Sequence, residues 1–185
     1  MRGNRKLLTF DLDGVLCRPP FGINPGSNRH KPRRTRGHAT ILSPTEPYRY
    51  FLRRPMAGAV EGFRRLAEAY ECHVLTARTE RTRRLTERWL ERWLGYVPVL
   101  HLRAGYDETP AAFKVRRTAE LGAFAHFEDD PHTALWVAEG IPYVFLVDWR
   151  RNRWLDHPRV HRLRRIAEAE ALLERLSTAI DVRPG

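Results

Sequence analysis

The chain has 185 residues, of which 42% are hydrophobic and 10% aromatic, and this composition excludes an intrinsically disordered chain. The length suits one domain, and no run approaches the ~20 apolar residues that span a bilayer. Asp11 and Asp13 interrupt the apolar stretch that follows the basic start, so we expect no signal peptide and no membrane contact. The two cysteines, Cys17 and Cys72, lack metal-ligand spacing, which favours a reduced, cytoplasmic protein.

The formal net charge of +11 predicts attraction to anions such as nucleotides, nucleic acids or phosphorylated metabolites. Many of the arginines, however, stand beside glutamates at helical spacing, as in the stretch RTERTRRLTERWLERW at 78–93. Such pairs usually form a solvated helix face. Charge alone therefore leaves two interpretations open, a polyanion partner and a charged surface without one.

Strand and helix patterns alternate along the chain. In order, the predicted elements are a strand at 6–12, a helix at 58–70, a strand at 72–77, a helix at 80–95, a strand at 97–102, a helix at 109–122, a strand at 124–129, a helix at 130–140, a strand at 142–148 and an amphipathic helix at 159–180. Thr109 before Pro110 and Asp130 before Pro131 are typical helix starts. The alternation predicts an α/β fold, with a three-layer, Rossmann-like parallel sheet covered by helices on both faces.

One segment, residues 17–56, does not fit this alternation. It is rich in proline and glycine and contains the basic run NRHKPRRTRGH at 28–38. A connection of this length is unusual in a compact domain unless it is functional or disordered. We predict a small, loop-rich, basic, cap-like insertion after the first strand, within a single domain spanning 1–185; a mobile basic loop without a specific role is the alternative.

Polar residues follow the predicted strands at the point where each strand ends. Asp11 and Asp13 close the first strand, residues 76–78 (Thr, Ala, Arg) close the second, and residues 128–130 (Glu, Asp, Asp) close the fourth. Lys114 lies early in the helix that precedes the fourth strand. In a parallel sheet these positions share one edge, where ligands bind. The sequence therefore predicts one site built from carboxylates, a hydroxyl and an ammonium.

This set of residue types fits phosphate chemistry. Carboxylates held close together repel each other unless a cation separates them, and Mg²⁺ commonly takes carboxylates, waters and a phosphate as ligands. Thr76 can donate to a phosphate oxygen, and Lys114 can add a positive charge. Asp11 can then act as nucleophile, and Asp13 can give and take a proton.

The arrangement resembles the haloacid dehalogenase (HAD) superfamily of phosphohydrolases. The matching residues are DLDGV at 11–15, LTAR at 75–78, Lys114 and FEDD at 127–130, all in the family's order within residues 6–148. Each motif is weak by itself, but four in order form a strong signal. The pattern is most similar to the 5′(3′)-deoxyribonucleotidase-type branch.

The resemblance implies a role for each residue. Asp11 would form an aspartyl-phosphate, while Asp13 would protonate the leaving group, activate water and bind Mg²⁺ through its backbone carbonyl. Thr76 and the amide of Ala77 would hold the phosphoryl oxygens, and Lys114 would bridge phosphate and nucleophile.

The acidic cluster requires a choice of metal ligand. Asp130 before Pro131 is an ordinary helix N-cap, so we expect Asp129 to join Asp11 and Asp13 at the metal. Whether Glu128 or Asp130 takes part as well stays open; Glu128 either supports the ligands without touching the metal or contacts it through a water.

Arg78 and the basic insertion are the features of the sequence that bear on the substrate. Arg78 is a tentative substrate-binding residue, and a simple ion pair with Glu80 is equally compatible with its position. We expect a Mg²⁺-dependent phosphomonoester hydrolase acting on a small phosphorylated substrate, with a nucleotide as one candidate. The basic insertion stands where the nucleotidases carry a helical cap, so a phosphatase acting on nucleic-acid ends is an alternative, as is a non-catalytic phosphate-binding module.

Overall fold

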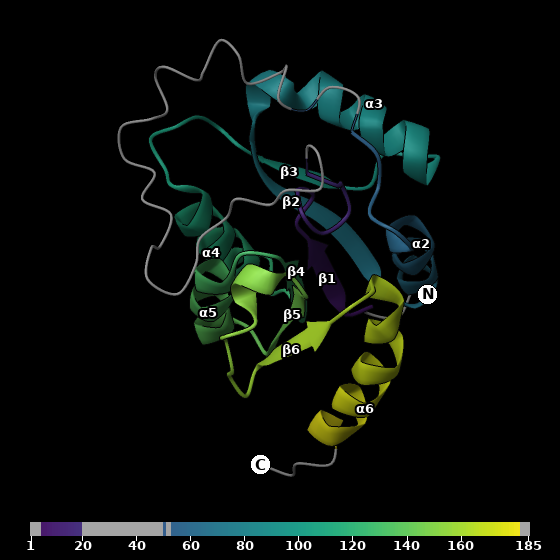
Figure 1. Cartoon of the computed structure of the whole chain (residues 1–185), viewed down its shortest axis with the longest axis vertical. Coiled ribbons are helices and arrows are strands. Elements are labelled where there is room, and N and C mark those ends of the chain that lie inside the picture. The colour runs from purple at the N-terminus through teal and green to yellow at the C-terminus, as the bar shows by residue number, and fades with distance from the viewer. Residues whose placement is uncertain (1–4, 20–49, 51–52, 182–185) are drawn as a thin grey trace.

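The sheet has six parallel strands in the order β3-β2-β1-β4-β5-β6 (Figure 1). The computed structural model describes residues 5–19, 50 and 53–181. The strands are β1 (Leu7–Phe10), β2 (Glu71–Thr79), β3 (Leu100–Arg103), β4 (Ala125–Glu128), β5 (Tyr143–Val147) and β6 (Val160–Leu163). Because β1 lies between β2 and β4, the motif-bearing strands are neighbours at the centre of the sheet.

Helices cover both faces of this sheet, as the alternating pattern predicts. They are α2 (Ala59–Ala69), α3 (Arg83–Leu94), α4 (Pro110–Glu120), α5 (Pro131–Gly140) and α6 (Ala169–Asp181). Helices α4 and α5 lie side by side on one face, and α2 and α6 lie on the other (Figure 1). The three-layer α/β prediction is confirmed. Among the described helices, none combines the length and apolar character that crossing a bilayer requires.

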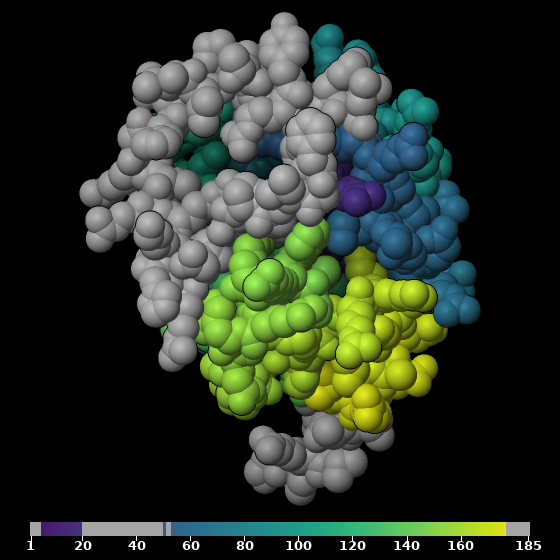
Figure 2. All heavy atoms as spheres, viewed as in Figure 1, coloured from purple at the N-terminus to yellow at the C-terminus, as the bar shows by residue number. Residues whose placement is uncertain are grey.

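Aromatic packing in the core fixes which way the central strands face. The ring of Phe10 stacks on Phe127 at 4.1 Å and meets Phe63 of α2 edge-on at 4.8 Å. Side chains alternate along a strand, so Thr9 and Asp11 point to the opposite face, toward α4. The space-filling view shows that little of residues 5–19 (purple) reaches this side of the surface (Figure 2).

Two helix starts and one helix end match the local signals in the sequence. The side chain of Thr109 accepts a hydrogen bond from the backbone N–H of Ala112 at 3.1 Å, and that of Asp130 accepts one from the N–H of Thr133 at 3.0 Å. Gly95 ends α3 with a φ of 85°. The N-cap role of Asp130 confirms the structural interpretation of that residue.

The helix predicted at 159–180 is wrong in its first half. Residues 160–163 form β6, which pairs with β5 in the register Val144↔Val160 to Val147↔Leu163, and the helix begins only at Ala169. The apolar spacing of this stretch fits a strand as well as a helix. Pairing with the free edge of β5 satisfies its backbone groups, and this tertiary contact decides the outcome.

Most of the insertion predicted at 17–56, including its basic run, lies outside the described residues. Its two ends are joined by backbone hydrogen bonds, from the N–H of Met56 to the carbonyl of Leu16 and from the N–H of Arg18 to the carbonyl of Arg54, both at 2.8 Å. The chain therefore leaves and re-enters the fold at one place, beside Cys17, which bridges to both Asp13 and Pro55.

Gly62 of α2 provides a test of the packing between α2 and the turn before α6. A Cβ at this position would lie 2.8 Å from the backbone N of Ala167 and 3.0 Å from the Cβ of Ile166. We expect Gly62→Ala to lower the free energy of unfolding by roughly 1–3 kcal/mol, because overpacking outweighs the gain in helix propensity. Urea denaturation measures this difference.

Gly140→Ala is the matched control, because its Cβ would meet Ala119 at an ordinary 3.9 Å. This variant should be neutral or more stable. Equal stability of Gly62→Ala and the wild type would contradict the packing described for α2.

Candidate active site

The two aspartates of the first motif occupy different environments. Asp11 directly follows β1, donates its backbone N–H to the carbonyl of Phe127 at 2.9 Å and is 5% exposed. The side chain of Asp13, two residues on, is 28% exposed. Gly14, with a φ of 91°, allows the chain to turn there. The motif thus places one buried and one accessible carboxylate at the carboxyl edge of the sheet.

Lys114 connects the first motif with the acidic cluster. Its Nζ lies 2.7 Å from Asp11 Oδ2 and 2.7 Å from Glu128 Oε2, and all three side chains are buried. Burial alone would lower the pKa of Lys114, but the two carboxylates outweigh it and raise that pKa. Burial raises the pKa of Asp11 to about 7, against the opposing effect of Lys114. The ammonium therefore opposes the effect of burial and favours the ionised form of Asp11.

Glu128 is held in place on both of its oxygens. Oε2 also lies 3.2 Å from His126 Nε2, whose Nδ1 is 2.9 Å from the hydroxyl of Thr9. Oε1 accepts the backbone N–H groups of Asp129 at 2.9 Å and Asp130 at 3.1 Å. Burial lowers the pKa of His126, which favours the neutral ring with Nε2–H as donor to Glu128. We infer that Glu128 orients Lys114.

Three carboxylates come close enough to share one cation. Asp11, Glu128 and Asp129 each offer an oxygen, and these oxygens lie within 4.8 Å of one another. Burial and the neighbouring Glu128 raise the pKa of Asp129 well above its ordinary range. Hard oxygen donors of this kind fit Mg²⁺. The structure thus brings together Asp11 and Asp129 of the expected metal set; the contact expected through the backbone carbonyl of Asp13 stays a prediction.

The carboxylate of Asp13 contacts two arginines instead. Arg78 donates from Nε to Oδ2 at 2.7 Å and from Nη2 to Oδ1 at 2.8 Å, and Arg53 donates from Nη1 to Oδ1 at 2.6 Å. Burial alone would raise the pKa of Asp13, but Arg78 and then Arg53 outweigh it and lower that pKa. Arg78 is 1% exposed, and Glu80 pairs with Arg83, so the proposed Arg78–Glu80 pair is wrong.

The second motif lies beside this ion pair, at the end of β2. Thr76 is buried, and its hydroxyl oxygen accepts the backbone N–H of Arg78 at 3.3 Å. Arg103 Nε donates to the carbonyl of Ala77 at 3.2 Å. Phosphate binding by Thr76 and the amide of Ala77 stays a prediction.

Sequence reasoning missed two arginines at the site. Arg53 comes from the end of the insertion, where no motif marks it. Arg151 Nη2 lies 2.5 Å from Asp129 Oδ2 and belongs to the 3-10 turn η4 (Arg150–Asn152) after β5. Its position three residues after the strand predicted at 142–148 was the one available signal.

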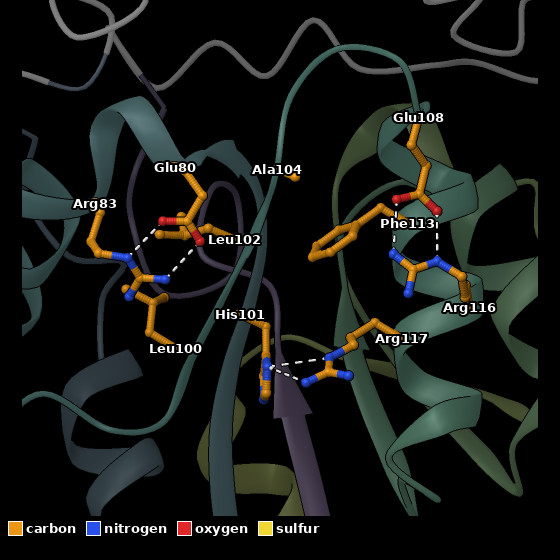
Figure 3. Close-up of a pocket in the computed structure, with 10 residues that line it drawn as sticks. All are labelled: Glu80, Arg83, Leu100, His101, Leu102, Ala104, Glu108, Phe113, Arg116 and Arg117. Atoms are coloured by element: carbon orange, nitrogen blue, oxygen red, sulfur yellow. Dashed lines mark hydrogen bonds and ion pairs between the residues drawn. The ribbon is translucent and has the colours of Figure 1, made fainter.

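A separate groove of about 380 Å³ lies beside edge strand β3, between the start of α3 and α4 (Figure 3). Charged residues that line the groove form ion pairs with one another, Arg83 with Glu80 and Arg116 with Glu108. None of the predicted site residues lines it, so its position does not support it as the active site.

Comparisons with solved protein structures identify the fold of the chain. No protein-family model and no curated protein matches the sequence. Two similar solved structures are haloacid dehalogenase-like hydrolases, from Streptococcus pneumoniae (12% identity, TM-score 0.65, covering 91% of this chain and 98% of that one) and Xanthomonas campestris (12%, 0.63, 97% and 99%). A third is D,D-heptose 1,7-bisphosphate phosphatase from B. bronchiseptica, complexed with magnesium and phosphate (16%, 0.55, 92% and 99%). The chain therefore has the HAD-like hydrolase fold.

The Asp13 ion pairs predict how stability depends on pH. Asp13→Asn leaves the buried Arg78 and the nearby Arg53 without their anion, so we expect a loss of about 2–4 kcal/mol in the free energy of unfolding at pH 7. The folded-state pKa of Asp13 lies below its ordinary 3.8, so this stability is present above that value and is lost as pH falls through the folded-state pKa. Denaturation from pH 7 to 3 should show the difference shrinking.

Glu170→Gln serves as control, because Glu170 and its partner Arg65 are 48% and 65% exposed and such surface pairs contribute at most about 1 kcal/mol. An Asp13→Asn variant as stable as wild type at pH 7 would argue against the described ion pairs.

Proposed function

We propose that this protein is a Mg²⁺-dependent phosphomonoester hydrolase that forms an aspartyl-phosphate on Asp11. The observation that carries the proposal is the buried ammonium of Lys114, 2.7 Å from both Asp11 and Glu128. A lysine in this position favours the ionised form of the nucleophile and places a positive charge near a phosphoryl oxygen. The solved phosphatase complex with magnesium and phosphate supports the same class of reaction.

The charges of the site support a phosphate substrate accompanied by a divalent cation. Four carboxylates contact or lie beside four cationic side chains: Asp11, Asp13, Glu128 and Asp129 on one side, Lys114, Arg53, Arg78 and Arg151 on the other. This balance changes little when a dication and a phosphate dianion arrive together, whereas either one alone leaves an uncompensated charge of two in a largely buried site.

The residues divide the reaction into two steps. An oxygen of Asp11 attacks phosphorus, the bond to the leaving oxygen breaks, and Asp13 supplies the proton to that oxygen. Asp13 then takes a proton from water, which attacks phosphorus and releases Asp11. Thr76 and the amide of Ala77 hold the phosphoryl oxygens. Mg²⁺, held by Asp11 and Asp129, would neutralise charge on the phosphate.

Arg78 and Arg53 affect the two steps differently. They favour the ionised form of Asp13, which the second step requires, since a base must accept the proton of water. For the first step Asp13 must take up a proton against this preference. The two arginines therefore favour the form of Asp13 that hydrolyses the aspartyl-phosphate over the form that protonates the leaving group.

Among phosphomonoesters, we propose a nucleotide as the first substrate to examine, on the strength of the resemblance to the 5′(3′)-deoxyribonucleotidase-type branch.

We also propose a cytoplasmic location, which the free thiols of Cys17 and Cys72 support.

The proposed mechanism is tested with Asp11→Asn. With Mg²⁺ and a panel of phosphomonoesters including mononucleotides, we expect the variant to lose activity by at least about a thousandfold, because the amide is not a nucleophile. Asp156→Asn changes an exposed aspartate and should keep wild-type rates. Released phosphate provides the measurement.

Two outcomes would contradict the mechanism. Hydrolysis that survives Asp11→Asn removes the aspartyl-phosphate. A wild-type protein that binds Mg²⁺ but hydrolyses no member of the panel is a phosphate-binding module.

A second candidate function is phosphatase activity on nucleic-acid ends. The segment at 20–49 contains six basic residues and one acidic residue. It leaves the fold beside Asp13, and its return places Arg53 2.6 Å from that carboxylate. Arg53 and the basic residues of this segment carry positive charge of the kind that binds a polyanion.

Comparing a mononucleotide with 3′- and 5′-phosphorylated oligonucleotides separates the two candidates. If the substrate is a nucleic-acid end, kcat/KM should be higher for the oligonucleotide and should fall steeply with salt, since phosphate contacts release counterions. Equal rates without a salt effect would leave the mononucleotide as the substrate class.

A further inference from the structure

Arg151 lies against the acidic residues to which the proposed function assigns the cation. Its Nη2 is 2.5 Å from Asp129 Oδ2, and its Nη1 is 3.8 Å from Asp130 Oδ2. The side chains of Arg151 and Asp129 are only 13% and 8% exposed. A guanidinium therefore stands beside the carboxylate that is the expected direct metal ligand.

The fold holds this arginine in place through its neighbour. Asn152 is fully buried and donates from Nδ2 to the backbone carbonyls of Asp129 at 3.0 Å and Val147 at 2.8 Å. Its Oδ1 accepts the backbone N–H of Trp149 at 3.1 Å. The turn that carries Arg151 is thus fixed both to the end of β5 and to the residue with which Arg151 pairs.

The contact has a direct consequence for a divalent ion. Asp11 and Glu128 share Lys114, whereas Asp129 pairs with Arg151. A Mg²⁺ ion lies about 2 Å from a ligating carboxylate oxygen, so an ion on Asp129 would stand a few ångströms from the guanidinium. Two positive charges at that distance, shielded from water, repel each other strongly.

Building on the proposed function, we propose that Arg151 is a built-in competitor of the divalent cation. It neutralises Asp129 while no cation is bound, and it weakens Mg²⁺ binding until a phosphate dianion arrives with the ion. Because such coupling is reciprocal, Mg²⁺ strengthens phosphate binding by the same factor. The site then binds Mg²⁺ and phosphate as a pair.

The test is direct measurement of Mg²⁺ binding to the full chain by calorimetry, without substrate. We expect Arg151→Gln to bind Mg²⁺ about tenfold or more tightly than wild type, because one nearby positive charge is gone. Arg150→Gln removes the same charge from an exposed neighbour in the same turn and should change the affinity by less than about twofold, since solvent and salt screen it. Equal or weaker binding by Arg151→Gln overturns the proposal.

A second measurement uses inorganic phosphate. Saturating phosphate should raise the Mg²⁺ affinity of wild type and should raise that of Arg151→Gln by a smaller factor; equal factors overturn the competitor role. Should Arg151→Gln fail to fold, Arg151→Met removes the same charge and should likewise bind Mg²⁺ more tightly than wild type; equal or weaker binding overturns the proposal.

These outcomes are distinct from failure of the proposed function. If wild type binds Mg²⁺ and hydrolyses phosphomonoesters but Arg151→Gln shows no gain in affinity, only the role of Arg151 is lost. If wild type neither binds Mg²⁺ nor hydrolyses any phosphomonoester, the proposed function is lost and this inference with it.

Discussion

The ammonium of Lys114, held between two buried carboxylates, is the interaction on which the site depends. Three charges taken out of water are tolerated only when their geometry is nearly ideal, and here both N–O distances are 2.7 Å. That geometry requires β1 next to β4, and α4 packed over the same face. The parallel pairing Phe10↔Phe127 and the stacked rings of those two residues set this arrangement from the apolar side. The core therefore positions the charges.

From this centre the carboxyl edge of the sheet divides into two parts with opposite chemistry. On one side Asp11, Glu128 and Asp129 form an acidic group suited to a cation. On the other, Arg78 and Arg53 hold Asp13 as an anion. The two aspartates have different surroundings although only Leu12 lies between them. The proposed nucleophile and the proposed proton carrier need different environments, and the short motif offers one buried and one more accessible carboxylate.

Arginines from three separate places complete the site, and each links it to a different part of the fold. Arg78 belongs to β2, Arg151 to the turn after β5, and Arg53 to the end of the insertion, where Trp89 of α3 also donates to the Arg53 carbonyl at 2.8 Å. Because Arg53 pairs with Asp13, a change in the insertion that moved Arg53 would alter the pKa of Asp13. The ionisation of Asp13 thus depends in part on Arg53, at the end of the segment inserted after β1.

The sequence by itself determined the features that depend on local chemistry. Alternating strand and helix patterns, the caps at Thr109 and Asp130, and polar residues at strand ends were readable because each is encoded within a few residues. The partners of those residues were not. Arg78 lies 65 positions from Asp13 in the sequence, and Arg151 lies 22 positions from Asp129. The residues next to an arginine in the sequence do not indicate which carboxylate it pairs with in the folded protein. Likewise, the spacing at 160–163 fits a helix or a strand, and only the free edge of β5 made it a strand. Side-chain pairing and strand pairing are properties of distance in space, so the tertiary structure alone decided them.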